Sequence, residues 1–298
     1  MADIIDGRKI AEEIKREVRE ETALLKSKHH ITPGLAFILV GENPASESYI
    51  RSKEKACGES GFYSVTERMS ADTTQSALLE KIRQFNKDPK IHGLLVQLPL
   101  PKHLNESEVI EAIDPRKDVD GFHPFNVGKL MIGEDTLKPC TPAGIQEMLV
   151  RSGNDPSGKH VVIVGRSNIV GKPIANILFQ KQSGANAIVT VAHTGAKDLA
   201  IYTKSADILI AAIGKPRFVT GAMLRAGVVV IDVGINRVAD ASAKNGYKIV
   251  GDVDFESASK VAKAITPVPG GVGLMTVAML LKNTLKAAKS LSSLNSLA

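Results

Sequence analysis

Short apolar runs alternate with longer amphipathic segments along the chain, and no other feature of the sequence constrains the fold as strongly. Strands that run parallel need a crossover connection, usually a helix, and strands buried on both faces of a sheet are near-continuous apolar runs. Such runs occupy residues 35–40, 93–97, 161–164, 188–191, 208–213 and 228–233. The alternation therefore predicts an α/β protein built on parallel sheets.

Helix signals lie between these runs. Asp6 is a good N-cap for a helix in which Ile10, Ile14 and Val18 recur at every fourth position, and Pro33 breaks the chain before the next strand. Residues 290–298 are expected to be a frayed tail. Further helices are predicted around Tyr49 and Lys53 up to Gly58 or Gly61, over 78–85, from a Thr141 cap with Pro142 at the first helical position through Val150, over 174–178, and over 276–286.

The chain length of 298 residues suggests two domains. Residues 114–142 are rich in Pro, Gly and Asp, and they separate two halves that each show the strand and helix alternation. We therefore expect the second half, after residue 140, to form its own parallel sheet.

Composition narrows the class of protein. Hydrophobic residues make up 43% of the chain and charged residues 23%, as in ordinary soluble proteins. No run of about 18 apolar residues is present, and the N-terminal segment mixes Glu with Lys and Arg, so we expect no transmembrane helix, secretory signal or transit peptide. Cys57 and Cys140 lack metal-ligand spacing and are too few for a disulfide framework. They indicate a cytoplasmic protein without a structural metal.

The net charge of +6 favours anionic partners. The basic residues are interleaved with acidic ones, as in residues 15–20, and aromatic residues are only 4% of the chain, with no tryptophan for base stacking. We therefore expect a small phosphate-bearing or polycarboxylate ligand, and neither nucleic acid nor membrane as a partner.

Four polar residues stand out in the first half. Tyr49 and Lys53 are four residues apart, so they share one face of a helix, and the phenol could contact the ammonium. Gln97 and Asp120 each follow an apolar or turn-rich stretch, where a parallel sheet presents side chains to ligands. Each has an ordinary explanation: a surface pair, a strand cap, or an Asx turn before Gly121. Gathered at one sheet edge, they would suit proton chemistry.

A glycine-containing turn in the second half predicts a nucleotide site. Residues 165–173 lie between a buried strand and a helix, where backbone N–H groups can bind phosphate, although the spacing is not GxGxxG. Arg166 could bind a phosphate bidentately, and a 2′-phosphate would indicate NADP; alternatively it is a surface arginine paired with an acid. Thr194 offers a hydroxyl near a strand end, whereas a histidine such as His193 is more often structural.

Several segments in order along nearly the whole chain closely resemble the bifunctional methylenetetrahydrofolate dehydrogenase and methenyltetrahydrofolate cyclohydrolase family. The resemblance implies an α/β fold of two domains, an N-terminal parallel-sheet catalytic domain and a Rossmann-like NAD(P)-binding domain. It is carried by residues 49–53, 96–101, 117–121, 139–142, 165–173, 232–237, 251–254 and 266–273.

The resemblance also implies the chemistry. The family oxidises 5,10-methylenetetrahydrofolate with NADP and hydrolyses the 5,10-methenyl product to 10-formyltetrahydrofolate. Lys53 is then the acid and base group, Tyr49 stacks on the folate and orients the lysine, Gln97 hydrogen-bonds Lys53, and Asp120 accepts hydrogen bonds from the pterin. The other substrate contacts implied are Leu98, Pro99, Pro267, Gly270 and Gly271.

The cofactor contacts implied are Gly165, Arg166, Ser167, Thr194 and the backbone of Ile235. Two positions depart from the family pattern. Leu274 stands where proline is usual, and Gly195-Ala196 replaces a basic residue and a threonine, which removes one expected contact to a 2′-phosphate. NADP is the expected cofactor, and NAD stays open.

The resemblance implies a folate-binding domain of residues 1–140 that is completed by residues 275–298, and a cofactor-binding domain of residues 141–274. It also implies a homodimer.

Two other interpretations account for part of the sequence. A short-chain dehydrogenase also uses Tyr-x-x-x-Lys, but there the nucleotide turn comes first, and here the order is reversed. A non-enzymatic nucleotide-binding or RNA-binding protein would leave Lys53, Gln97 and Asp120 without a role.

Overall fold

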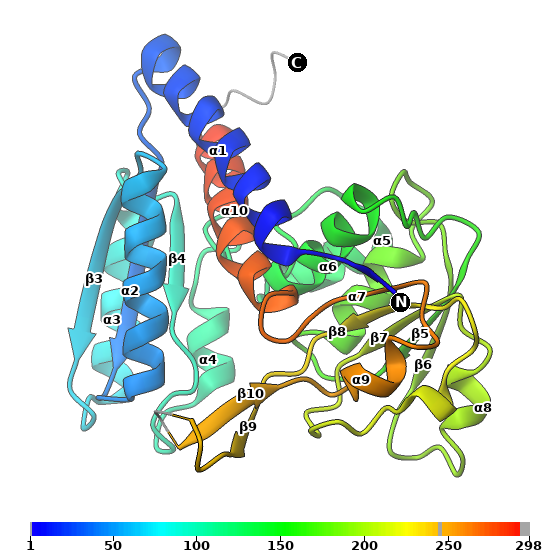
Figure 1. Cartoon of the computed structure of the whole chain (residues 1–298). Helices are drawn as coiled ribbons and strands as arrows, with labels where there is room; N and C mark the ends of the chain where they lie inside the picture. Colours follow the sequence, from blue (N-terminus) through cyan, green and yellow to red (C-terminus); the bar gives the residue numbers. More distant parts are fainter. Residues whose placement is uncertain (1, 244–245, 293–298) are drawn as a thin grey trace. The chain divides into compact units, whose positions relative to one another are not determined.

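The computed structural model describes residues 2–243 and 246–292, which fold as two compact units (Figure 1). The six-stranded unit comprises the chain up to Ala11 together with Thr141–Thr276, and the three-stranded unit comprises Glu12–Cys140 together with the chain from Val277 onward. The folate-binding and cofactor-binding ranges given above stay a prediction. By contacts between Cα atoms, residues 2–11 group with the six-stranded unit.

The three-stranded unit has a parallel sheet in the order β3-β2-β4. The strands are β2 (Gly34–Val40), β3 (Tyr63–Met69) and β4 (Gly93–Val96), and every residue of β2 is buried. The predicted runs at 35–40 and 93–97 are therefore strands. The sequence did not predict β3, because this edge strand is mostly half-buried and carries charged residues.

Helices in the first half of the chain follow the predicted signals. The Oδ1 atom of Asp6 accepts from the N–H groups of Arg8 and Lys9, at 2.8 and 3.2 Å, so the predicted cap is confirmed. Leu78 and Ile82 of α3 pack with Ala36 and Ile38 of the sheet in one apolar cluster. The helices are α1 (Gly7–His29), α2 (Pro44–Glu59), α3 (Gln75–Lys87), α4 (Glu106–Glu111) and α5 (Pro124–Ile132).

The C-terminal helix α10 (Met275–Leu291) returns to the three-stranded unit. Lys289 pairs with Glu21 of α1, and the two helices lie side by side in Figure 1. Lys286 pairs with Asp135 before α6. The helix is longer than the predicted 276–286, so residues 290 and 291 are helical and not frayed, whereas 293–298 lie outside the described residues.

The six-stranded sheet has the order β1-β11-β8-β7-β5-β6, and all of its pairs are parallel. Its central strands are buried runs, as the sequence predicted, and helices cross over between them. The predicted buried run at 188–191 is a strand, but it is not buried, because β6 lies at the edge of the sheet. An antiparallel hairpin of β9 (Asn236–Ala239) and β10 (Tyr247–Val250) follows β8. The sheet strands are β1 (Asp3–Ile4), β5 (His160–Val164), β6 (Ile188–Ala192), β7 (Ile208–Ala211), β8 (Val229–Asp232) and β11 (Ala264–Ile265).

One helix start differs from the prediction. Helix α6 spans Cys140–Arg151, so Pro142 lies inside the first turn and Thr141 is not its cap. A proline is tolerated there because the first N–H groups of a helix have no partner within the helix. The Thr141 hydroxyl lies 3.0 Å from the Thr276 hydroxyl instead. The remaining helical segments are α7 (Gly171–Leu178), α8 (Ala200–Thr203), η1 (Gly221–Met223), α9 (Phe255–Ala258) and η2 (Val272–Leu274).

Among residues 2–243 and 246–292, no helix has both the length and the apolar character needed to cross a bilayer. Nor does that part of the chain contain a group of three His, Cys, Asp or Glu side chains able to hold a metal ion.

Candidate active site

Lys53 lies on α2 with its side chain buried, and its ammonium donates to Gln97. The residue is 8% exposed, and the distance from Nζ to Gln97 Oε1 is 3.0 Å. Gln97 directly follows β4, and its Nε2 donates to the Leu98 carbonyl at 2.7 Å. This second bond fixes the carboxamide, so Oε1 faces the lysine as an acceptor. A lysine is seldom this buried, and the position is typical of a functional group.

Asp120 lies in a turn whose shape requires Gly121. Gly121 has φ +74°, and a Cβ there would lie 2.5 Å from the carbonyl carbon of Lys138. The turn exposes part of the Asp120 side chain. Burial raises the pKa of the Asp120 carboxyl to about 6, against the lowering effect of the Lys53 ammonium, and the Asp118 carboxyl adds to the rise. Lys53 and Asp120 are thus electrostatically coupled.

Asp118 holds this turn in place. Its carboxylate accepts from the N–H groups of Gly121 and His123, at 3.1 and 2.8 Å, and from Asn126 Nδ2 at 2.8 Å. The residue is 2% exposed, and burial raises its pKa while these hydrogen bonds oppose the rise. Asp118 therefore positions Asp120 through the backbone.

Two residues that the sequence analysis did not assign to the site clamp the segment beside Asp120. Asn283 of α10 donates from Nδ2 to the carbonyls of Val119 and Lys138, both at 2.8 Å. The Cys140 thiol also donates to Val119, at 3.2 Å, and burial together with the Asp120 charge raises its pKa. Asn283 lies 164 positions from Val119, so no local sequence signal could have found this pairing.

The other residues predicted for the folate site are more exposed. Tyr49 is 51% exposed, one helical turn before Lys53, and the described residues include no hydrogen bond between the two side chains. Leu98 is half-buried and Pro99 is exposed, and the peptide bond between them is cis. The structure therefore brings together Lys53, Gln97 and Asp120 and leaves Tyr49 open to a ligand.

In the six-stranded unit, Gly165 and Gly171 form a tight connection from β5 to α7. A Cβ on Gly165, which has φ +132°, would lie 2.1 Å from the Ala212 carbonyl oxygen. A Cβ on Gly171 would lie 2.3 Å from the Gly165 carbonyl oxygen. Both positions require glycine, which allows the backbone to form a compact loop at the start of the helix.

Ser167 caps α7. Its Oγ accepts from the N–H groups of Val170 and Gly171, at 3.1 and 3.3 Å. The hydroxyl hydrogen is then free to donate to a ligand, because both bonds use the oxygen only as an acceptor.

Arg166 is exposed and lies next to His193, which follows β6. No acidic side chain pairs with this arginine in the described part of the chain, so the alternative of a surface ion pair is not observed. Arg166 Nη1 lies 3.4 Å from His193 Nε2, and the Gly195 N–H donates to His193 Nδ1 at 3.0 Å. A neutral imidazole has one acceptor nitrogen, so in a given tautomer the ring accepts only one of these two bonds, either from Arg166 or from Gly195.

Two further predicted cofactor residues also follow strands of this sheet. Thr194 is exposed after β6, and Ile235 is 53% exposed after β8. Asp252 holds the loop with Ile235, because it accepts from Asn236 Nδ2 at 2.8 Å and from the Ile213 N–H at 2.6 Å. Gly165, Thr194 and Ile235 thus share the carboxyl edge of one parallel sheet, where ligands bind in such folds.

The loop of residues 267–273 packs against the N-terminal segment. The Gly7 N–H donates to the Gly270 carbonyl at 3.0 Å, and a Cβ on Gly271 would lie 2.7 Å from the Pro267 carbonyl oxygen. The Val268–Pro269 peptide bond is cis. Leu274 ends the loop and is 39% exposed. The loop is therefore closely packed even though proline is absent at position 274.

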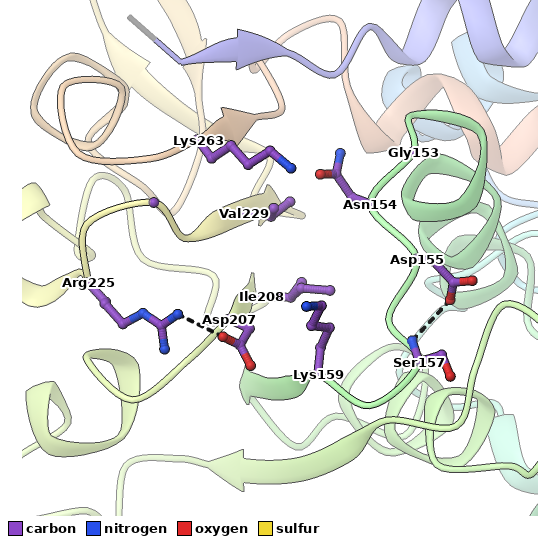
Figure 2. A pocket seen from close by; sticks show the side chains of 11 residues that line it. Gly153, Asn154, Asp155, Ser157, Lys159, Asp207, Ile208, Arg225, Val229 and Lys263 are labelled. Atoms are coloured by element: carbon purple, nitrogen blue, oxygen red, sulfur yellow. Dashed lines mark hydrogen bonds and ion pairs between the residues drawn. The ribbon is translucent and has the colours of Figure 1, made fainter.

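A pocket of about 540 Å³ lies at the opposite, amino edge of the same sheet (Figure 2). Lys159, Asp207 and Lys263 line it and directly precede β5, β7 and β11. Asp207 is paired with Arg225 at 2.8 Å. Lys263 and Asn154 point toward one another across the opening in Figure 2. No residue predicted for folate or cofactor binding lines this pocket.

Comparison with known proteins supports two functional regions. Residues 5–120 match the catalytic domain of tetrahydrofolate dehydrogenase/cyclohydrolase, and residues 139–292 match the NAD(P)-binding domain of the same enzyme. The bifunctional protein FolD of Syntrophus aciditrophicus is 57% identical over 288 residues, which are 97% of this chain and 98% of that protein.

Solved structures agree. The bifunctional FolD methylenetetrahydrofolate dehydrogenase/cyclohydrolase of Campylobacter jejuni matches with TM-score 0.91 and 48% identity, covering 97% of this chain and 99% of that chain. A methylenetetrahydrofolate dehydrogenase-cyclohydrolase of Trypanosoma brucei, complexed with NADP cofactor and an inhibitor, matches with TM-score 0.91 and 41% identity, covering 97% and 98%. The chain therefore belongs to the tetrahydrofolate dehydrogenase/cyclohydrolase family.

Proposed function

We propose that this chain oxidises 5,10-methylenetetrahydrofolate to the 5,10-methenyl form with NADP and hydrolyses that form to 10-formyltetrahydrofolate, as a bifunctional enzyme of one-carbon metabolism. The observation that carries the proposal is the buried Lys53 ammonium, held by Gln97 at 3.0 Å and coupled to Asp120. This arrangement sits in a chain whose two halves match the catalytic and NAD(P)-binding domains of one family.

Lys53 is the proton carrier of the hydrolytic step in this proposal. Water adds to the methenyl carbon, and the neutral amine takes a proton from that water. The bond from this carbon to N5 then breaks, Lys53 returns its proton to N5, and the second water proton leaves to solvent.

Gln97 and Asp120 have separate tasks. Gln97 Oε1 faces Lys53 because the Leu98 carbonyl binds the other end of the carboxamide, so Gln97 keeps the amine in position. Asp120, once ionised, accepts hydrogen bonds from N–H groups of the pterin. Its pKa of about 6 leaves it largely ionised at neutral pH.

The residues at the carboxyl edge of the six-stranded sheet fit a dinucleotide. A side chain at Gly165 or Gly171 would fill the loop, Ser167 keeps a free hydroxyl hydrogen, and Arg166 lacks an acidic partner among the described residues. When bound, NADP supplies the hydride acceptor. Arg166 favours NADP over NAD because a guanidinium can bind a 2′-phosphate. Thr194 and the Ile235 backbone are the other proposed contacts.

The remaining assignments are also proposals. Tyr49 is exposed one turn from Lys53 and can stack on the folate. Leu98, Pro99, Pro267, Gly270 and Gly271 are proposed substrate contacts, and residues 1–140 with 275–298 and 141–274 are the proposed folate and cofactor domains. The two thiols are buried and unpaired, which suits a reducing cytoplasm. A homodimer is proposed, and light scattering of the purified chain tests it.

A parallel assay of the wild-type chain tests the proposed reaction. 5,10-Methylenetetrahydrofolate is mixed with NADP or with NAD, and reduced nicotinamide, the methenyl chromophore and 10-formyltetrahydrofolate are followed together. We expect reduction with NADP and formation of the formyl product with little methenyl intermediate. If neither dinucleotide is reduced, the proposed function is wrong.

A further inference from the structure

Two aspartates at the carboxyl edge of the six-stranded sheet are buried next to each other. Asp232 ends β8 and is 3% exposed, and Asp252 lies two residues after β10 and is 0% exposed. Among the described residues, neither carboxylate has an ion-pair partner. Burial raises the pKa of Asp232 to about 6, and the charge of Asp252 adds to the rise. Because buried like charges are costly, such a pair is typical of a functional site.

Asp232 accepts hydrogen bonds only from the backbone. Its Oδ1 accepts from the N–H groups of Gly234 and Asp252, both at 2.9 Å, and its Oδ2 accepts from the Val253 N–H at 3.0 Å. Gly251 allows the close approach, because a Cβ there would lie 1.8 Å from Asp232 Oδ2. Asp232 therefore fixes the backbone of the second aspartate.

Asp252 joins the loops that follow two neighbouring strands. Its Oδ2 accepts from the N–H groups of Ile213 and Gly214 after β7, at 2.6 and 2.9 Å. Its Oδ1 accepts from Nδ2 of Asn236, at the start of β9, at 2.8 Å. Donors thus approach both oxygens, so only an ionised carboxylate satisfies both sides at this position.

The residue held by the two carboxylates is Ile235. The residue before it is bound by Asp232 and the residue after it by Asp252. In the part of the chain that the structure describes, the N–H and the carbonyl of Ile235 have no hydrogen-bond partner, and the residue is exposed. One backbone donor and one backbone acceptor are therefore held in place and left free, which suits a carboxamide ligand.

The position of this loop in the sheet selects the half of a dinucleotide that it meets. Strand β5 has β6 on one side and β7 on the other, so the strand order reverses there. A dinucleotide binds across such a point, with one mononucleotide half on each side. Arg166 and Thr194 follow β5 and β6, and Arg166 is the proposed contact of the adenosine 2′-phosphate. The loops after β7 and β8 therefore meet the nicotinamide half.

We infer that Asp252 is a positioning residue for hydride transfer, which acts through Asn236 to hold the Ile235 backbone against the nicotinamide carboxamide. The inference rests on the proposed function, because it takes a nicotinamide dinucleotide as the ligand. In that reaction a C–H bond of the methylene carbon breaks, and the hydride with its electron pair bonds to the nicotinamide ring, which leaves the methenyl cation. Loss of the Asp252 contacts should slow this step and leave the hydrolysis at Lys53 unchanged.

Exchanging the side chains at positions 236 and 252 tests the contact. Asp252→Asn turns an NH₂ group either toward the Asn236 amide or toward two backbone N–H groups, so donor meets donor. Asn236→Asp turns two carboxylates toward each other. The double variant restores the bond with its direction reversed: position 252 keeps an oxygen for the loop after β7 and donates from its nitrogen to the carboxylate at 236.

The measurement is dinucleotide reduction in a single turnover, with saturating 5,10-methylenetetrahydrofolate and NADP, together with titration calorimetry of NADP. We expect each single variant to lower the rate constant by roughly tenfold to a hundredfold, the range for a hydrogen bond to a charged group. The number of NADP sites per chain, and the hydrolysis of added 5,10-methenyltetrahydrofolate, should stay at the wild-type level. The double variant should recover most of the rate.

Asp240→Asn is the matched control. Asp240 follows the other end of β9, where its carboxylate binds Ser242 and Lys248 away from the buried pair. The variant removes the same charge from the same hairpin and should reduce NADP with the wild-type rate constant.

The possible failures are distinguishable. Single variants that have fewer NADP sites but the wild-type rate constant would show that Asp252 only stabilises the fold, which would overturn the inference. A double variant no faster than the single variants would also overturn it, because the bond between positions 236 and 252 would then not set the rate. Failure of the wild-type chain to reduce either dinucleotide would instead overturn the proposed function, and the inference with it.

Discussion

The candidate folate residues and the candidate cofactor residues differ in how far their polar groups are already satisfied within the chain. In the three-stranded unit, Lys53 is 8% exposed and bound to Gln97, and Asn283 clamps the segment beside Asp120. In the six-stranded unit, Arg166 and Thr194 are exposed, and the contact of Arg166 with the His193 ring is long, at 3.4 Å.

The difference follows from the two tasks. A group that moves protons must be held in one geometry with a tuned environment, so its partners are built into the protein. Groups that bind a soluble dinucleotide must leave donors free until the ligand arrives, since only ligand oxygens can satisfy them. The comparison predicts that substitutions near Lys53 lower the reaction rate strongly, whereas substitutions near Arg166 weaken dinucleotide binding.

The largest expected effect is that of Lys53→Met. The variant should reduce NADP but accumulate the methenyl intermediate, with the cyclohydrolase rate lowered by about 100-fold or more, because the proton carrier is lost. The measurement is the methenyl absorbance during turnover. Lys55→Met is the matched control, because Lys55 lies on the same helix with its side chain 78% exposed. A wild-type level of the methenyl intermediate in Lys53→Met would show that Lys53 is not the proton carrier.

The next largest effect concerns the rigid turn of the first region. Gly121→Ala forces an alanine to φ +74° and places its Cβ 2.5 Å from the Lys138 backbone. We expect a loss of about 2 kcal/mol or more in the free energy of unfolding, measured by denaturant titration. Gly128→Ala is the control, since its Cβ meets nothing within 4 Å in helix α5. Equal stability of the two variants would show that the turn at Asp120 does not require glycine at position 121.

The pH dependence of folate binding tests the role of Asp120 in the first region. Its pKa is about 6 in the folded chain, and only the carboxylate accepts from two pterin N–H groups, so folate affinity should fall as the pH drops through 6. We expect KM for the folate to rise about tenfold from pH 7.5 to pH 5, and Asp120→Asn to remove this dependence. A KM that stays constant over this range in the wild type contradicts the role of Asp120.

The smallest effect is expected at Gly195. Gly195→Ala keeps the His193 side chain but places a methyl group 2.9 Å from its Cε1 atom, which shifts the ring. The shifted ring changes the His193 contact with Arg166, the proposed 2′-phosphate residue, so the affinity for NADP should fall by a few-fold, on the order of one weakened hydrogen bond, while NAD serves as the internal control. If both affinities stay unchanged, the ring position is unimportant for selectivity.

Sequence patterns predicted much of this architecture because periodicity reports burial. The run at 161–164 is a strand because each of its residues is buried, and Asp6 is a cap because its carboxylate meets N–H groups only two and three residues away. The sequence did not predict edge strand β3, because its residues are half-buried or exposed and include charged ones, so it lacks a continuous apolar run.

The partners of the site residues could not be predicted. The Asn283 bond to Val119 and the Arg166 contact with His193 join positions far apart in sequence, and only tertiary packing decides them. Thr141 shows the same limit on a smaller scale. It is a residue type that often caps helices, but the helix begins at Cys140, two residues before the predicted start at Pro142, and the Thr141 hydroxyl contacts that of Thr276.

The central claim is that proton chemistry depends on Lys53 and cofactor affinity on the separate Arg166 region. The most direct test is the hydrolysis of added 5,10-methenyltetrahydrofolate without any dinucleotide, by Lys53→Met and by Arg166→Ala. The account predicts hydrolysis near the uncatalysed rate for Lys53→Met and at the wild-type rate for Arg166→Ala. Wild-type hydrolysis by Lys53→Met, or an equal loss in Arg166→Ala, would contradict it.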